Sequence, residues 1–147
     1  MLVERITQID NNAFDVIYDA NSASIIENIG YDDKEALRNT FSDEADNFYL
    51  FSFTKNGEVV GYVQGFGKGD TLTAHDTVTK SSDVLPEAVE GSNVLLKSLG
   101  FAYLDVDCVP NVPMYTYAKS ACLRDDLYEY VSEQERENDI IVKLRLL

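Results

Sequence analysis

The chain has 147 residues, with 26 acidic side chains against 12 basic ones, a formal charge of −14 and a pI near 4.2. This balance excludes charge-driven binding to nucleic acid or to an anionic membrane, because such binding depends on Lys and Arg. Hydrophobic residues make up 45% of the chain and aromatic residues 11%, which is enough for an ordinary core, and the length predicts one domain over residues 1–147.

Metal-binding and membrane classes are also disfavoured. Cys108, Cys122 and His75 are the only residues of their types, and three such ligands cannot complete a structural zinc site unaided. No basic segment followed by an apolar stretch opens the chain, and no window approaches the ~18 apolar residues that span a bilayer. We therefore expect a cytoplasmic protein without a metal, whose two cysteines are buried small hydrophobic residues rather than nucleophiles.

The first part of the chain predicts a strand followed by two helices. Residues 2–9 are rich in β-branched side chains, which favours a strand. Apolar residues at three- and four-residue steps from Phe14 to Ile29 then predict an amphipathic helix that ends at Gly30. Asp32 is positioned to cap a second, short helix.

The middle of the chain predicts three strands. Two strand-like runs flank Asn56-Gly57, the strongest short-range signal for a β-hairpin. Residues 71–79 form a further predicted strand, with Leu72, Ala74 and Val78 expected on one alternate face.

The last part predicts a helix that begins at a cap, Ser82 or Asp83, and ends at Gly100. The remaining predicted elements are a strand at 101–108, a helix at 114–122, and a hairpin formed by 127–132 and 140–146. The order β-α-α-β-β-β-α-β-α-β-β predicts an α+β or mixed α/β fold with a single central sheet.

The negative charge is concentrated in two segments. Residues 10–46 hold ten acidic and two basic side chains, and residues 125–139 hold seven acidic and one basic. The rest of the chain is close to neutral. Either the two segments are solvated surfaces, or their negative field attracts a cationic molecule.

Three segments, in this order of elements, make the whole chain similar to the GCN5-related N-acetyltransferase (GNAT) family. NGEVVGYVQGFG (56–67) resembles the strand in which the family has G-x-V/I-x-G. GSNVLLKSLG (91–100) resembles its cofactor-binding helix, and VPNVPMYTYAKSACL (109–123) resembles its V-x-x-N-x-x-A segment. The resemblance implies a mostly antiparallel central sheet flanked by helices, and metal-free transfer of an acetyl group from acetyl-CoA to a primary amine.

The resemblance also implies a site for the CoA pyrophosphate. The family binds it on backbone N–H groups of a Q/R-x-x-G-x-G/A turn at a helix N-terminus. Here residues 87–92 align with that turn, with Glu87 and Glu90 in place of the basic residue and the first glycine. Repulsion from these carboxylates predicts weak CoA binding, while the preceding KSSD turn offers a shifted anion site. The cofactor-binding residues that the resemblance implies are Thr77, Val78, Lys80, Ser81, Ser82, Gly91, Ser92 and Asn111.

For catalysis, the family uses a tyrosine to protonate the departing thiolate. Alignment on Asn111 puts Ala118 at that position, so Tyr117 or the neighbouring Tyr115 is the candidate acid. Tyr117 can equally be a core aromatic residue. His75 is a candidate general base acting through a water, or else a surface histidine on its strand.

The resemblance and the charge together predict a cationic amine acceptor such as a polyamine, an aminoglycoside or a lysine-rich peptide, and they allow a homodimer. Two alternatives belong to other classes of protein. One is a catalytically silent binding module on the same fold, and the other is an acidic inhibitor that mimics nucleic acid. Asp105 and Asp107 alternate on one face of the fifth strand, where they can bind a cation or form a solvated strand edge.

Overall fold

We describe the protein from a computed structural model. The structure describes residues 1–29, 33–41, 46–81, 83–108, 115, 118–119 and 126–147. Most of the helix predicted at 114–122 lies outside these residues. The elements are β1 (Leu2–Ile6), α1 (Asn11–Ile29), α2 (Lys34–Thr40), β2 (Phe48–Lys55), β3 (Glu58–Lys68), β4 (Thr71–Thr79), α3 (Val84–Ser98), β5 (Tyr103–Cys108), β6 (Tyr128–Glu135) and β7 (Ile140–Leu146).

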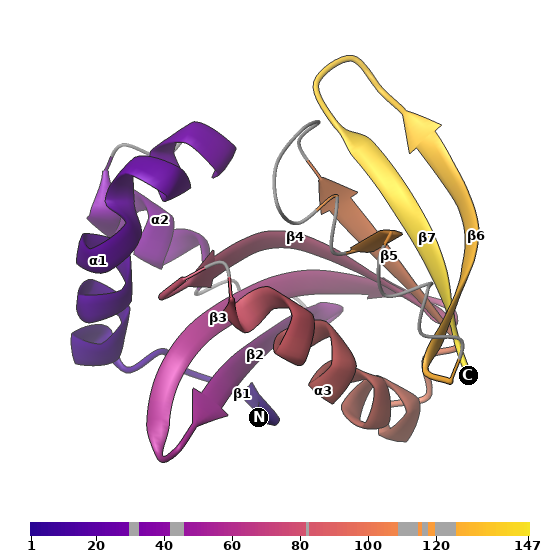
Figure 1. The fold of residues 1–147 in the computed structure, drawn as a ribbon, viewed down its shortest axis with the longest axis horizontal. Coiled ribbons are helices and arrows are strands. Elements are labelled where there is room, and N and C mark those ends of the chain that lie inside the picture. The colour runs from indigo at the N-terminus through magenta and orange to yellow at the C-terminus, as the bar shows by residue number, and fades with distance from the viewer. Residues whose placement is uncertain (30–32, 42–45, 82, 109–114, 116–117, 120–125) are drawn as a thin grey trace.

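The strands form one seven-stranded sheet in the order β1-β2-β3-β4-β5-β7-β6 (Figure 1). β4 and β5 pair in parallel, and the other neighbouring pairs are antiparallel. The parallel pair follows from the chain order, because α3 carries the chain back across the sheet between β4 and β5. The predicted α+β fold with a single, mostly antiparallel central sheet is confirmed.

The β2–β3 hairpin turns at Asn56 and Gly57, as predicted. Their φ angles are 52° and 79°, and Lys55 pairs with Glu58 on either side. Two consecutive positive φ angles define the type I′ turn, whose twist matches that of the strands it joins. The Asn-Gly sequence tolerates this conformation because glycine has no Cβ and asparagine is enriched in the left-handed region.

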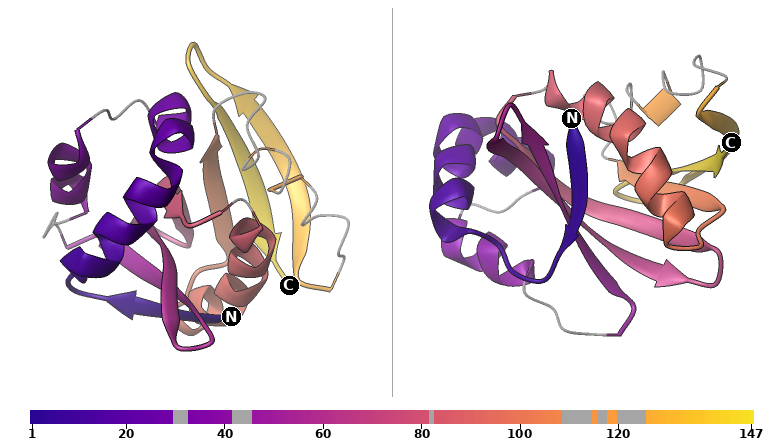
Figure 2. Two further views of the ribbon diagram at one scale, coloured as in Figure 1. Left: turned by 60° about the vertical axis from the view of Figure 1, so that its left-hand side comes forward. Right: turned by 90° about the horizontal axis from the view of Figure 1, so that it is seen from below.

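The helices cover opposite faces of the sheet, as the right-hand view of Figure 2 shows. We call the side covered by α3 the α3 face; its core includes Phe51, Leu72, Leu96, Leu104 and Val142. The side covered by α1 and α2 is the α1–α2 face. Its core consists of Ile9, Phe14, Ile17, Tyr18, Leu37, Phe41, Leu50, Tyr62 and Val78.

Two predicted boundaries near the N-terminus are wrong. The first strand ends at Ile6 rather than residue 9, because Asp10 already caps α1 by accepting from the backbone N–H of Asn12 at 2.9 Å. The cap of α2 is Asp33 rather than Asp32: its Oδ1 accepts from the N–H of Glu35 at 3.0 Å. In both places the residue directly before the helix supplies the oxygen that its unpaired N–H groups need.

A β-bulge interrupts β4 and changes which side chains share a face. Val63 pairs with Thr77 and Gly65 with Ala74, so that two residues of β4, His75 and Asp76, lie opposite Gln64 of β3. The alternation of side chains therefore changes phase at the bulge. Leu72 and Ala74 lie on the α3 face, whereas Val78 lies in the core of the α1–α2 face. The prediction that these three share one face is wrong for Val78.

The G-x-V-x-G sequence of β3 allows β4 to come close at the bulge. A Cβ on Gly65 would lie 2.7 Å from the carbonyl oxygen of Thr73, closer than a side chain can approach a backbone atom. Glycine is therefore required beside the bulge by the distance between the two backbones.

Candidate functional site

The parallel pairing of β4 and β5 is short. Among the described residues it runs from Thr71 and Tyr103 to Ala74 and Val106, where the β4 bulge begins. Beyond this point the two parallel strands separate, and Figure 1 shows the ribbons of β4 and β5 diverging. The bulge therefore lies where the sheet opens between two neighbouring strands.

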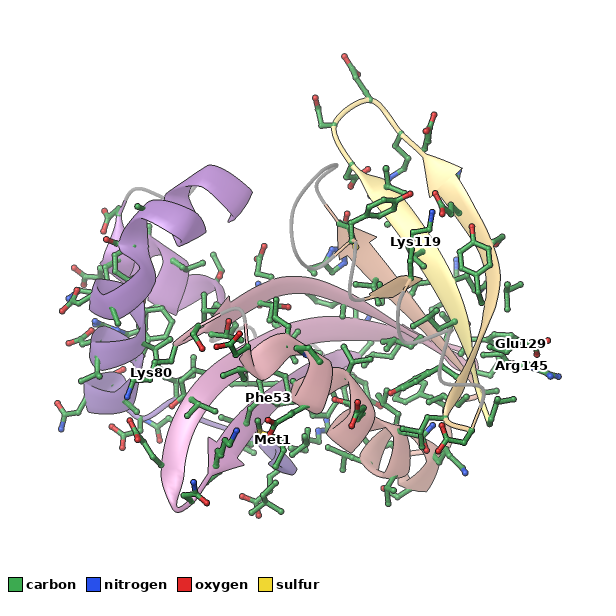
Figure 3. All side chains as sticks on the ribbon, viewed as in Figure 1. Met1, Phe53, Lys80, Lys119, Glu129 and Arg145 are labelled. Atoms are coloured by element: carbon green, nitrogen blue, oxygen red, sulfur yellow. The ribbon has the colours of Figure 1, made fainter. Side chains whose placement is uncertain are left out.

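On the α3 face, a cavity of about 50 Å³ lies between α3 and the strands beside this opening. Its lining is almost wholly apolar and includes Ala74, Ala88 and Val106, with Thr77 and Ser92 among the few polar residues. Figure 3 shows Phe53, which also lines it, beneath α3. The volume exceeds the ~10–15 Å³ that one water needs, but an apolar lining gives a water few partners. The cavity suits a small apolar group.

On the α1–α2 face, the bulge places two polar side chains next to each other. The ring of His75 lies edge-on to that of Phe66, with 5.6 Å between the centroids. The carboxylate of Asp76 accepts from the Nε2 of Gln64 at 2.6 Å. In a regular strand these neighbours would point to opposite faces, so the bulge is what brings both to one side.

His75 also contacts β5. Its Nδ1 lies 3.1 Å from the Oδ2 of Asp107, and Nη2 of Arg136 lies 3.6 Å from the same oxygen. The hydrogen bond to Asp107 raises the pKa of His75 above its usual value of 6.5, although burial opposes this. Protonation of His75 is therefore stabilised by its partner on the neighbouring strand.

The side chain of Asp76 is half-buried. Burial raises the pKa of its carboxyl group, and the hydrogen bond from Gln64 partly offsets this effect. Gln64 is 5% exposed, and its Nε2 also lies 3.4 Å from Oγ1 of Thr40 in α2. This polar cluster joins β3, β4 and α2 beneath the helices of the α1–α2 face.

Tyr115 belongs to a different cluster, beside β6. Its hydroxyl donates to Oε2 of Glu133 at 2.8 Å, and Nζ of Lys119 lies 2.8 Å from Oε1 of the same carboxylate. Lys119, labelled in Figure 3, also donates to the Tyr115 hydroxyl at 3.2 Å. The hydrogen bonds from Lys119 and Tyr115 lower the pKa of Glu133 to about 2. Tyr115 is therefore held by an ionised carboxylate.

The structure brings two of the predicted cofactor-binding residues together: Thr77 and Ser92 both line the cavity. The Oγ of Ser92 donates to the carbonyl oxygen of Ala88 within α3. Val78 is buried on the opposite face of the sheet. Ser81 is exposed, and its carbonyl oxygen accepts from the N–H of Val84 at 3.2 Å.

Lys80 points away from the start of α3, because its Nζ pairs with Glu58 of β3 at 2.7 Å (Figure 3). Ser82, Asn111 and Tyr117 lie outside the described residues.

The position predicted for the pyrophosphate turn is wrong. Residues 87–92 lie inside α3, which begins at Val84, so they form helix rather than a turn. A Cβ on Gly91 would lie 2.9 Å from Cγ2 of Val3, which gives this glycine a role in packing α3 against β1. Glu87 pairs with Lys55 at 2.8 Å, so its charge is balanced. The carboxylate of Glu87 is therefore neutralised by Lys55, and the expected repulsion of the pyrophosphate by Glu90 stays a prediction.

The N-terminus of α3 at Val84 comes shortly after the end of β4 at Thr79 in the chain. Asp83 occupies the N-cap position but makes no side-chain hydrogen bond to the helix. The first N–H groups of a helix lack partners within it, and the helix dipole favours an anion there. These N–H groups belong to the start of α3 at Val84, one turn before the residues aligned with the pyrophosphate turn.

Several polar residues near the opening did not stand out in the sequence: Gln64, Asp76, Glu133 and Arg136. Gln64 and Asp76 meet only because of the bulge. For Asp107 the sequence predicts a cation ligand or part of a solvated strand edge. β5 is instead an inner strand, and Asp107 is paired with His75. The sequence does not reveal that Ala74 pairs with Val106, and this pairing is what places His75 beside Asp107.

Other groups have simpler roles. Cys108 is buried, and burial raises its pKa to about 12, so its thiol stays protonated as a small core residue. Within the part of the chain that the structure describes, no three His, Cys, Asp or Glu side chains are arranged to hold a metal ion. No helix among the described residues is long and apolar enough to cross a bilayer.

Comparison of the sequence with protein-family models gives no match, and comparison with curated proteins gives none either. The structure, in contrast, is similar to many solved ones. The GNAT domain of PAT from S. lividans superposes with a TM-score of 0.72 at 14% identity, covering 98% of this chain and 89% of that one.

Two further structures extend this similarity. Aminoglycoside acetyltransferase AAC(6′)-Ib, in complex with coenzyme A and kanamycin, has a TM-score of 0.68 at 12% identity, covering 99% of this chain and 94% of that one. The ribosomal-protein-S18-alanine N-acetyltransferase from Escherichia coli has a TM-score of 0.59 at 10% identity, covering 99% and 93%. The chain thus has the fold of the GCN5-related N-acetyltransferases.

Proposed function

We propose that the protein is an acetyl-CoA-dependent N-acetyltransferase, with residues 1–147 acting as one domain. The observation that carries the proposal is the opening between β4 and β5, which has an apolar cavity on one face of the sheet and His75, Asp76 and Asp107 on the other. The apolar acyl end of a thioester can thus approach the opening from one face of the sheet, and the ammonium group of an amine can approach it from the other. The fold is that of enzymes crystallised with coenzyme A.

In this proposal the cavity beneath α3 holds the acyl end of the thioester, and acetyl-CoA supplies the activated acetyl group. The apolar lining excludes water, which would otherwise hydrolyse the thioester. Thr77 and Ser92 supply the polar contacts of this cavity, and the start of α3 supplies N–H groups for the pyrophosphate. Because Glu87 is paired with Lys55, we expect no large electrostatic penalty on CoA binding.

Transfer needs a base and an acid. An ammonium group must lose a proton before its nitrogen can attack, and His75 can take that proton through a water because it lies at the opening. The thiolate of CoA must gain a proton when it leaves. Tyr117 stays the first candidate for this acid, because the hydroxyl of Tyr115 is already engaged as the donor of a hydrogen bond to Glu133.

The acceptor is proposed to be a cationic amine. The two acidic segments include α1 and α2 on one side of the opening, and β6 with the turn that leads to β7 on the other side (Figure 1). Some of these charges are paired, as Asp19 is with Lys34 at 3.0 Å, but the segments keep a large net negative charge. A negative field raises the local concentration of a multiply charged amine. Kanamycin, in the complex named above, is such an amine.

The test measures the free thiol of CoA released from acetyl-CoA in the presence of a panel of amines with one to four charges, from 10 mM to 200 mM NaCl. We expect turnover that favours the multiply charged amines and a KM that rises with salt, since the Debye length falls from about 30 Å at 0.01 M to about 10 Å at 0.1 M. Thermal stabilisation by acetyl-CoA is the parallel binding assay. No turnover and no stabilisation would contradict the proposal, whereas turnover independent of charge and salt would contradict only the cationic acceptor.

A further inference from the structure

His75 is the only histidine in the chain, and three strands determine its position. β4 carries it in the bulge, Phe66 of β3 packs against its ring, and Asp107 of β5 binds its Nδ1. The side chain of His75 is 36% exposed and that of Asp107 is 20% exposed. A histidine that only filled a surface position would not need contacts from three elements.

We propose that Asp107 is a positioning residue for His75: it accepts the Nδ1–H and so leaves the basic lone pair on Nε2. This inference deepens the proposed function, because it states how the base is held ready for a proton. A neutral imidazole carries its proton on either nitrogen, and the hydrogen bond made by one nitrogen selects the tautomer. Asp107 does not touch the acceptor in this arrangement and acts through His75.

The register of the sheet explains why Asp107, and not the other aspartate of β5, has this role. Ala74 pairs with Val106, so the residues that follow them, His75 and Asp107, lie side by side on the α1–α2 face. Asp105 lies on the same face two residues earlier and has the same 20% exposure, but it pairs with Lys143 at 3.3 Å. The two carboxylates thus share a strand, a face and a degree of burial, and they differ in partner.

Charged groups from several elements surround the pair. Asp76 of β4 and Asp107 of β5 favour the protonated form of His75, and Asp139 adds negative charge before β7. Arg136, at the end of the β6–β7 hairpin, opposes them. Its guanidinium binds Asp139, with Nε 2.6 Å from Oδ1, and its Nη2 lies 3.6 Å from the same Oδ2 of Asp107 that His75 contacts.

The experiment uses NMR of the single histidine, which reports directly on His75 without any need for activity. Nitrogen-15 shifts identify the tautomer, and a pH titration gives the pKa. In the unmodified protein we expect the Nδ1–H tautomer and a pKa above 6.5. In Asp107→Asn we expect the pKa to fall by about 0.5 units or more, because a neighbouring charge is lost. Asp105→Asn is the matched control and should shift the pKa by less than about 0.2 units, because its charge is farther away and paired with Lys143.

A second measurement follows the pH profile of acetyl transfer. We expect the acidic limb of kcat/KM to move to lower pH in Asp107→Asn, with kcat reduced by about tenfold or more and the KM of the amine little changed. Asp105→Asn should keep the original profile. If Asp107→Asn fails to fold, Asp107→Ser replaces it in the same two measurements.

The two proposals fail in different ways. Equal NMR titrations for the Asp107 and Asp105 variants, or a neutral form protonated on Nε2 in the unmodified protein, would overturn the positioning role even in an active enzyme. Absence of acetyl transfer together with the expected NMR shifts would overturn the proposed function and leave the support of His75 by Asp107 established.

Discussion

The two faces of the sheet differ most at the place where β4 and β5 separate. On the α3 face the strands contribute leucine, valine and alanine side chains to a cavity. On the α1–α2 face the same stretch of β4 contributes His75 and Asp76, beside Asp107 of β5. The alternation of side chains beyond Ala74 and Val106 places His75 and Asp107 on this face, and the extra residue in β4 adds Asp76 to them because the bulge changes the phase of the alternation. A single irregularity in one strand thus enlarges the polar group on one face, while the lining of the cavity on the other stays almost wholly apolar.

The largest expected effect comes from the apolar side. Leu96 of α3 is 1% exposed and lines the cavity, so Leu96→Ala removes buried atoms and enlarges an existing void. We expect the free energy of unfolding to fall by about 2–5 kcal/mol, measured by urea denaturation. Val94→Ala, on the same helix but with the valine 74% exposed, is the control and should change stability by about 0.5 kcal/mol or less. Similar losses for both would show that α3 is not packed as described.

The next effect concerns the bulge itself. Gly65→Ala would place a Cβ 2.7 Å from the carbonyl oxygen of Thr73, so one backbone must shift. We expect a loss of about 1–3 kcal/mol in stability, and a weaker contact between His75 and Asp107 because the shift occurs beside the bulge. The histidine titration and urea unfolding measure the two consequences.

Gly91→Ala is the matched control for that substitution. Its new Cβ would lie 2.9 Å from Cγ2 of Val3, so a branched side chain rather than a backbone must shift, and this cost opposes the ~0.5–1 kcal/mol that alanine gains over glycine inside a helix. We expect stability to change by less than about 1 kcal/mol and the affinity for CoA to stay unchanged. A large loss of CoA affinity in Gly91→Ala would indicate that residues 87–92 bind the pyrophosphate after all.

The sequence was a good guide to the elements and a poor one to the site. Turn chemistry at Asn56-Gly57 and periodicity in the helices are local properties, so the hairpin, α1, α3 and the single sheet could be predicted. The bulge could not, because the residues 71–79 alternate as a regular strand would. The one residue in the sequence that indicates the bulge is Gly65. A glycine is required there because the backbone of β4 lies too close for a Cβ, and not because the chain turns.

The candidate site also depends on pairing between distant strands. His75 and Asp107 are 32 residues apart, and only the β4–β5 register makes them neighbours. The residues aligned with the pyrophosphate turn, 87–92, are helical, since a motif aligned by its letters does not reveal where a helix begins. α3 begins at Val84, and the Glu87 side chain faces Lys55 instead of a phosphate.

A smaller effect is expected at Tyr115. Tyr115→Phe removes the hydrogen bond to Glu133 and one of the contacts of Lys119. We expect a loss of about 0.5–1.5 kcal/mol in stability with turnover nearly unchanged, because the Lys119–Glu133 pair remains. Tyr117→Phe is the comparison and should lower kcat by about 10²-fold with little change in melting temperature if Tyr117 is the acid. The opposite pattern would transfer the role of the acid to Tyr115.

The smallest expected effect is the pH dependence of stability on the polar side. The pKa of His75 is raised in the folded protein above 6.5, the usual value that applies to the unfolded chain. The folded state therefore binds the proton more tightly, and this contribution to stability is complete below pH 6.5 and is lost as the pH rises through the folded pKa.

Because the side chain of His75 is 36% exposed, solvent screens the effect and we expect a small one. Urea unfolding of the unmodified protein and of His75→Gln between pH 5.5 and 8.5 isolates it, since carboxylates that do not interact with His75 contribute equally to both curves. The difference in stability should decline with rising pH, and Asp107→Asn should flatten that decline while Asp105→Asn leaves it in place. A difference that grows with rising pH would mean that burial outweighs Asp107 and that His75 is held in its neutral form.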